Sequence, residues 1–164
     1  MVPHHTLHGK MEAQRQAMDR SSEKLKNSFW YSHKALGSET KAFYGDIYNL
    51  PDELGTFDAV LYGLILTHLR DPFQALYSGA RLCAGTIIVT GMFGSQPNGA
   101  SIFRPDYNNT HGTHSWWLLS ASTLENMLGA LGFKIKHIQN FSAMCVAPRH
   151  EGQRDMQALV AERV

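Results

Sequence analysis

The sequence has few cysteines, no long apolar run and almost no excess of charge. Cys83 and Cys145 are its two cysteines, and they form no CxxC pattern, so neither a disulfide framework nor a zinc knuckle is indicated. No apolar run approaches the roughly 20 residues that span a bilayer. The net charge of +1 provides no bulk attraction to DNA or to an anionic membrane surface.

The beginning of the sequence also lacks a signal peptide, because Met1–His5 contains no apolar segment. We therefore expect a soluble protein in the cytoplasm. Of the 164 residues, 43% are hydrophobic and 18% are charged, which is typical of a globular protein rather than of a disordered or membrane protein. This length fits one domain.

The centre of the sequence reads as a strand, a helix and a second strand. Phe57–Tyr62 and Thr86–Thr90 are short apolar runs, typical of strands in a parallel sheet that is covered on both faces. Between them, Asp71 followed by Pro72 predicts the start of a helix, which we expect to extend to Leu82. The spacing indicates a right-handed βαβ unit, and such sheets bind ligands at the carboxyl ends of their strands.

Further elements are predicted before this unit. Lys10–Leu36 favours helix and ends at Gly37, a residue typical of helix carboxyl caps. Ser21–Glu23 is a point where this segment would separate into two helices, the second of which packs on the core. Lys41–Tyr44 reads as a short strand that leads into a Gly45-Asp46 corner.

Other elements are predicted after the unit. The capping box Ser122–Glu125 starts a helix that ends at Gly132. Phe133–Phe141 and Ala143–Ala147 are predicted as an antiparallel pair at the edge of the sheet. The connection Gly91–Ser115 has the length of a functional lid or of a disordered segment.

These segments predict one domain with two appendages. We expect flexible residues 1–8, an α/β domain over residues 9–149 and a polar tail over residues 150–164. Within the tail, Gln153–Glu162 is expected to be helical.

Several short motifs stand in an order that resembles the class I S-adenosylmethionine-dependent methyltransferases. They lie within residues 25–147 and are Gly45-Asp46, Leu50-Pro51, Phe57–Val60, Leu66–Pro72, Ala75-Leu76, Arg81-Leu82, and Trp116-Trp117 ahead of the helix that ends in Leu131–Phe133. The resemblance implies an α/β fold with a partial Rossmann-like sheet flanked by helices. Nothing before Phe43 matches the first two strands of the family or its glycine-rich turn.

The resemblance also implies S-adenosylmethionine as cofactor and assigns residues to it. Asp46 would accept a hydrogen bond from the adenine amino group, because a carboxylate only accepts, and Ile47 would lie beside the ring. Leu61, Tyr62 and Gly63 would face the methionine part and the methyl acceptor. Gly63 permits close approach of a ligand to the backbone, and the Tyr62 ring attracts the sulfonium.

His68 and Tyr62 are the candidate catalytic residues. His68 is suited to a general base, because histidine is the side chain that most often has this role; the alternative is a structural histidine in the loop before Asp71. Asp46 has an alternative too, as a turn residue of the Gly-Asp corner.

Two further assignments are weaker than their alternatives. Asp19 lies 27 positions before Asp46 (46 − 19), as a ribose-binding acid would, but its neighbours are helix formers. His111 and His114 lack carboxylate or cysteine partners at metal-ligand spacing, and solvated loops explain them and the amino-terminal histidines better. No metal is expected.

The function that these patterns indicate is methyl transfer to a small molecule or a modified base. The alternatives are a non-catalytic methyltransferase remnant or assembly partner, and a small α/β module for another ligand. The absent strands leave sheet edges unpaired, which is unfavourable. Either the Lys41–Tyr44 strand pairs directly with Phe57–Tyr62, or a second copy or a partner chain completes the sheet. We expect neither DNA nor a membrane as partner.

Overall fold

The computed structural model describes residues 11–94, 99–104, 115–147 and 150–164. These residues divide into two compact units, unit 1 up to residue 45 and unit 2 from residue 46. In unit 1, helix α1 (Met11–Ala35) is continuous, so the predicted break at Ser21–Glu23 is wrong. The Gly37 cap is confirmed. Gly37 has a φ of +57°, and the Ser38 N–H donates to the His33 carbonyl over 3.0 Å, as in a Schellman motif.

Residues 41–44 of unit 1 form no strand, and that prediction is wrong. The indole N–H of Trp30 donates to the Tyr44 hydroxyl over 3.1 Å, and the Lys26 ammonium lies 5.0 Å from the centre of the Tyr44 ring. These contacts with α1 hold the segment against the helix. A pattern that fits a strand therefore serves here to cover a helix face.

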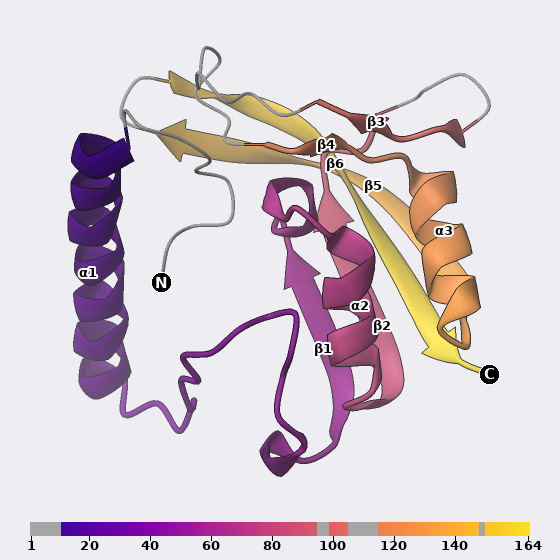
Figure 1. Cartoon of the computed structure of the whole chain (residues 1–164), viewed down its shortest axis with the longest axis horizontal. Helices are drawn as coiled ribbons and strands as arrows, with labels where there is room; N and C mark the ends of the chain where they lie inside the picture. The colour runs from indigo at the N-terminus through magenta and orange to yellow at the C-terminus, as the bar shows by residue number, and fades with distance from the viewer. Residues whose placement is uncertain (1–10, 95–98, 105–114, 148–149) are drawn as a thin grey trace. The chain divides into compact units, whose positions relative to one another are not determined.

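Unit 2 contains the sheet, shown in Figure 1. Its four strands, in spatial order, are β1 (Phe57–Gly63), β2 (Cys83–Gly91), β6 (His150–Arg163) and β5 (Phe133–Ala147). The other elements of this unit are helices α2 (Pro72–Ala80) and α3 (Ala121–Ala130), the 3-10 turns η1 (Asp52–Leu54) and η2 (Leu66–His68), and the pair β3 (Ile102–Phe103) and β4 (Trp117–Leu118). Strands β1 and β2 are parallel, which confirms the βαβ unit.

Helix α2 begins as predicted. The Asp71 carboxylate accepts a hydrogen bond from the Gln74 N–H over 2.9 Å, and Pro72 occupies the first turn. The N-cap of helix α3 is Ser120, two residues before the predicted N-cap Ser122, because the Ser120 hydroxyl accepts from the Thr123 N–H. Gly132, with a φ of +81°, follows the end of α3 as expected.

Both helices pack on one face of the sheet. Ile87 lies opposite Ala161, and Val89 lies opposite Leu159; all four are buried together with residues of α2 and α3 in one cluster. Figure 1 shows α2 lying along β1 and β2. On the other face, Leu61 of β1 is 65% exposed and Ile88 and Val160 are partly buried. Within the described part of unit 2, helices therefore cover one face, whereas the apolar runs predict cover on both.

The carboxyl-terminal strand differs most from expectation. Residues 150–163 form β6, which lies between β2 and β5, so the predicted helix Gln153–Glu162 is wrong and the tail is part of the sheet. Leu159 and Ala161 are buried and alternate with more exposed neighbours, which is the period of a strand. The two predicted strands from Phe133 to Ala147 are one strand, β5, and its antiparallel partner is β6.

Arg163 fixes the end of β6 to the rest of the core. Its guanidinium donates to the Ala80 carbonyl over 2.6 Å and to the Cys83 carbonyl over 2.7 Å, and it lies over the Phe133 ring. The carbonyl of Ala80 belongs to the last turn of α2, where a positive charge is favourable. In the residues that the structure describes, no helix is both long enough and apolar enough to cross a membrane.

Candidate functional site

The candidate site lies where β1 and β2 end. Gly63 lies opposite Thr90, and the Leu64 N–H donates to the Thr90 carbonyl over 3.1 Å, so the two carboxyl ends are held side by side. A Cβ built on Gly63 meets no atom within 4 Å, and the φ of Gly63 is not in the left-handed region. Neither the backbone nor the packing therefore requires glycine here, and the space above it is free for a ligand.

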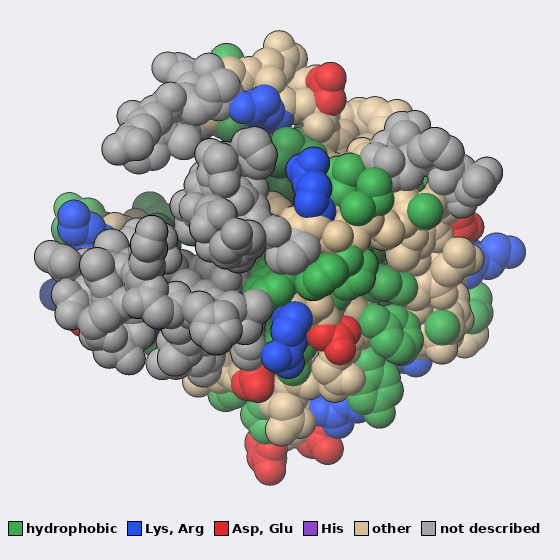
Figure 2. All heavy atoms as spheres, turned by 45° about the horizontal axis from the view of Figure 1, so that its top comes forward, with side chains coloured by type: hydrophobic (Ala, Val, Ile, Leu, Met, Phe, Trp, Pro, Cys, Tyr) green, Lys and Arg blue, Asp and Glu red, His purple; other side chains and the backbone are tan. Residues whose placement is uncertain are grey.

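Apolar side chains surround this strand end. Leu64 has a φ of 56° and is the one non-glycine residue with positive φ in the described part of the chain, a conformation that costs about 1–2 kcal/mol for such a residue. Leu64, Ile65 and Met92 are exposed. Figure 2 turns the upper end of Figure 1 toward the viewer and shows hydrophobic side chains gathered on this face, with Lys, Arg, Asp and Glu side chains among them. The strained residue and the exposed apolar surface both indicate a binding site.

Asp46 makes a turn and keeps its carboxylate exposed. Its Oδ1 accepts a hydrogen bond from the Tyr48 N–H over 3.0 Å, and its carbonyl accepts from the Asn49 N–H over 3.1 Å. The turn that the sequence offers as an alternative is therefore present. The second carboxylate oxygen takes no part in these bonds, so the turn is compatible with ligand contact. Ile47 is partly buried and packs against the core.

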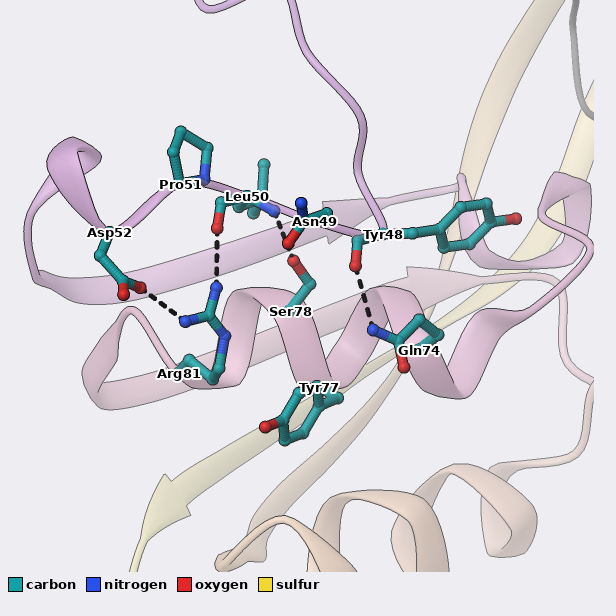
Figure 3. Close-up of a pocket in the computed structure, with 9 residues that line it drawn as sticks. All are labelled: Tyr48, Asn49, Leu50, Pro51, Asp52, Gln74, Tyr77, Ser78 and Arg81. Atoms are coloured by element: carbon teal, nitrogen blue, oxygen red, sulfur yellow. Dashed lines mark hydrogen bonds and ion pairs between the residues drawn. The ribbon is translucent and has the colours of Figure 1, made fainter.

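The segment after Asp46 is bound along α2, as Figure 3 shows. The Gln74 amide donates to the Tyr48 carbonyl, the Leu50 N–H donates to the Ser78 hydroxyl, and Arg81 donates to the Leu50 carbonyl, over 3.0, 2.9 and 2.7 Å. Arg81 also pairs with Asp52. These contacts border a cavity of about 350 Å³. The Tyr48 hydroxyl accepts from the Asp71 N–H over 3.2 Å, which places this segment at the start of α2, beside the strand ends.

Tyr62 does not reach the strand end with its side chain. It is 4% exposed, and its hydroxyl donates to the Ala75 carbonyl of α2 over 2.9 Å. Burial raises the pKa of Tyr62 to about 12. Odd-numbered residues of β1 face away from α2, whereas Tyr62 faces it, so the ring belongs to the core. The structure thus contradicts both the catalytic role of Tyr62 and the contact of its ring with a sulfonium.

The raised pKa of Tyr62 predicts a loss of stability at high pH. The unfolded chain ionises near pH 10 and the folded protein near 12, so this stabilisation is complete below pH 10 and disappears as the pH rises to 12. The expected loss is about 1.4 kcal/mol per pH unit in that window. Urea unfolding at stepped pH measures it. Tyr62→Phe should flatten the dependence, whereas Tyr77→Phe, at an exposed tyrosine, should leave it unchanged; equal slopes in both variants would contradict the assignment.

His68 lies in the turn η2 directly after the strand end. The backbone N–H of His68 donates to the Ile65 carbonyl over 2.9 Å. The neighbouring Thr67 carbonyl accepts from the Trp116 N–H over 2.9 Å, and the Trp117 indole donates to the Arg70 carbonyl over 3.0 Å. The tryptophan pair thus fixes the loop that carries His68 near Gly63. Its role as a base stays a prediction.

The weaker assignments gain no support. Asp19 lies within α1, not at the end of a strand, as the helix-forming neighbours indicate. His111, His114 and the amino-terminal histidines lie outside the described residues. Among the described residues, no three His, Cys, Asp or Glu side chains form a group that would hold a metal ion.

Comparison with solved structures identifies the fold as that of the class I S-adenosylmethionine-dependent methyltransferases. Magnesium protoporphyrin IX methyltransferase from Synechocystis PCC 6803, with bound S-adenosylhomocysteine, is 17% identical; the match covers 82% of this chain and 57% of that one, with a TM-score of 0.52. The amino-terminal domain of EvdMO1 is 20% identical; the match covers 82% of this chain and 58% of that one, with a TM-score of 0.53. A methyltransferase from Aquifex aeolicus is 12% identical; the match covers 84% of this chain and 63% of that one, with a TM-score of 0.52.

These likenesses confirm the fold that the motif order predicts. The chain spans about half to two thirds of the length of these proteins. No protein-family model matches the sequence, and no curated protein matches it either.

Proposed function

We propose that this chain contributes the adenine side and the acceptor side of an S-adenosylmethionine-dependent methyltransferase. The observation that carries the proposal is the open strand end at Gly63, which lies close to the start of α2 where the exposed Asp46 turn is bound. In sheets of this kind, ligands bind outside the carboxyl ends of the strands. The proposed substrate is a small molecule or a modified base.

The residues present fit part of the cofactor. Asp46 would accept from the adenine amino group with its second carboxylate oxygen, with Ile47 beside the ring. The backbone of Leu61–Gly63 would border the methionine part, since the Tyr62 side chain is buried. The cofactor, when bound, supplies an electrophilic methyl group. His68 would take a proton from the acceptor, and the exposed apolar residues would exclude water once a ligand covers them.

The amino-acid end of the cofactor has no matching turn in this sequence. Losing a glycine-rich turn removes several kcal/mol of binding, and about 4 kcal/mol separates a micromolar from a millimolar dissociation constant. We therefore expect S-adenosylhomocysteine to bind this chain with a dissociation constant on the order of millimolar. Isothermal titration measures this directly. The absence of binding at millimolar ligand would contradict the proposal for the chain by itself.

A second candidate function is that of an assembly partner, and the free edge of β1 favours it. Strand order places β1 at one edge of the described sheet. Because the Leu64 N–H points toward β2 and the direction alternates along a strand, the N–H groups of Ala59, Leu61 and Gly63 point outward. This edge contains no lysine or proline to prevent pairing. We propose that a second copy pairs along it.

Ala59→Pro tests the edge pairing. Proline removes an outward N–H and leaves the β1–β2 ladder intact, so the folded monomer should tolerate it. Light scattering should show a dimer for the wild-type chain and a monomer for Ala59→Pro. Ala59→Ser keeps the N–H and should remain dimeric. A monomeric wild-type chain would rule out pairing between copies.

A further inference from the structure

A second cavity lies where β5 and β6 extend past the end of β2. It has a volume of about 410 Å³ and is lined by Phe93, Asn140–Ser142 of β5 and Asp155–Gln157 of β6. Gly91, the last residue of β2, lies opposite Gln157. Figure 1 shows both strands running on beyond β2 at the end of the sheet where β1 also stops. The volume is in the range of small-molecule sites.

One side of this cavity is lined by polar side chains that are held by hydrogen bonds to one another. Asn140 lies opposite Gln157, and Ser142 lies opposite Asp155, so these four side chains share one face of the ladder. The Gln157 amide donates to Asn140 Oδ1 over 2.8 Å, and the Ser142 hydroxyl donates to Asp155 Oδ1 over 2.6 Å. Three polar atoms take no part in these bonds: the Asn140 amide nitrogen, the Gln157 amide oxygen and the second Asp155 oxygen. One donor and two acceptors therefore indicate a ligand with an acceptor and donors of its own.

The other side is an aromatic ring. A Cβ on Gly91 would overlap the Phe93 ring, so glycine at this position allows the ring to lie over the end of β2. Phe93 also packs against the hydrophobic core, which holds it in place. A phenyl ring beside a polar floor favours a flat ligand that stacks on the ring.

We propose that this cavity binds the methyl acceptor, and that the acceptor is a planar ring carrying a hydroxyl or amino group. The inference rests on the proposed function and adds the substrate class to it. The Asp155 carboxylate selects a neutral or cationic donor and repels anionic ligands.

The polar side chains of the cavity lie on the face of the sheet that α2 covers, because Gln157 lies opposite Gly91 and Leu159 opposite Val89, whereas Gly63 faces the other way. Strand β6 is two strands from β1, so at a strand spacing of about 4.8 Å the cavity is at least roughly 10 Å from Gly63. An acceptor longer than that would reach past the strand ends to the cofactor site.

The test uses 7-hydroxycoumarin and coumarin, two flat ligands that differ by one hydroxyl, with the full chain in a buffer acidic enough to keep the hydroxyl protonated. Binding is measured by ligand-detected NMR titration. We expect 7-hydroxycoumarin to bind about tenfold more tightly than coumarin. Asp155→Asn preserves the bond from Ser142 and should remove this preference. Phe93→Leu, which keeps the bulk without the ring, should weaken both ligands severalfold.

Glu162→Gln is the matched control, because Glu162 is an exposed carboxylate on the same strand that pairs with Lys136 outside the cavity. It should leave both affinities unchanged. Equal binding of the two ligands to the wild-type chain, or an Asp155→Asn preference like that of the wild type, overturns the inference. If the coumarin pattern holds and S-adenosylhomocysteine does not bind, the methyltransferase function fails and the ligand class stands. If S-adenosylhomocysteine binds and the coumarin pattern does not appear, this inference is overturned and the proposed function stands.

Discussion

Gly63→Val should abolish binding of S-adenosylhomocysteine while the protein stays folded. A Cβ on Gly63 meets no atom within 4 Å, so the valine side chain fills the space that we assign to the ligand. The φ of residue 63 does not require glycine, and valine is favourable in strands. The free energy of unfolding should therefore stay the same or rise by about 0.5–1 kcal/mol.

The expected loss in affinity is at least tenfold for Gly63→Val and smaller for Gly63→Ala, because the obstruction grows with the side chain. Ala84→Val places the same side chain on an exposed residue at the amino end of β2 and is the matched control. It should leave the affinity unchanged. If Gly63→Val binds like the wild-type chain, the ligand does not lie over the end of β1.

Gly79→Ala should destabilise unit 2 by about 1–3 kcal/mol. Gly79 lies in α2 where a Cβ would overlap the Tyr62 hydroxyl oxygen, and that hydroxyl is buried and bonded to the Ala75 carbonyl. The methyl group must therefore push α2 away from β1 or displace the tyrosine ring. Because α2 holds both the Asp46 turn and the end of β1, cofactor binding should weaken too.

Gly129→Ala gives the matched control in the other helix that covers the sheet. A Cβ at Gly129 meets nothing within 4 Å, so the substitution should stabilise the protein by about 0.5–1 kcal/mol through helix propensity. Urea unfolding of the two variants should show changes of opposite sign. A Gly79→Ala protein as stable as the wild type would mean that α2 does not pack on β1 as described.

Local signals in the sequence predict the elements whose ends are determined by adjacent residues. Asp71 and Pro72 start α2, and Gly37 and Gly132 follow the ends of α1 and α3, because capping depends on contacts within a few residues. The motif order predicts the methyltransferase fold for a similar reason, since Leu66–Pro72 and Arg81-Leu82 mark the two junctions of the βαβ unit. Lys41–Tyr44 fits a strand equally well by local pattern, and its contacts with α1 decide otherwise.

The place of β6 depends on contacts that are distant in sequence. Its alternating residues Leu159 and Ala161 gain burial from β2 and the helices, which the local polar composition of residues 150–164 does not reveal. The cavity over β5 and β6 depends on the same distant contacts, although the alternation around Leu159 is a signal for a strand. The position of Tyr62 at a strand end predicts a place in the site, whereas the direction of its side chain depends on packing against α2.

Amide chemical-shift mapping with S-adenosylhomocysteine tests the account most directly, because it detects millimolar binding and locates it. We expect the largest shifts at Gly63 and Leu64, with further shifts at Asp46 and Ile47. Cys83–Gly85, at the opposite end of β2, should not change. Shifts confined to other parts of the chain, or none at millimolar ligand, would contradict a cofactor site at the carboxyl ends of β1 and β2.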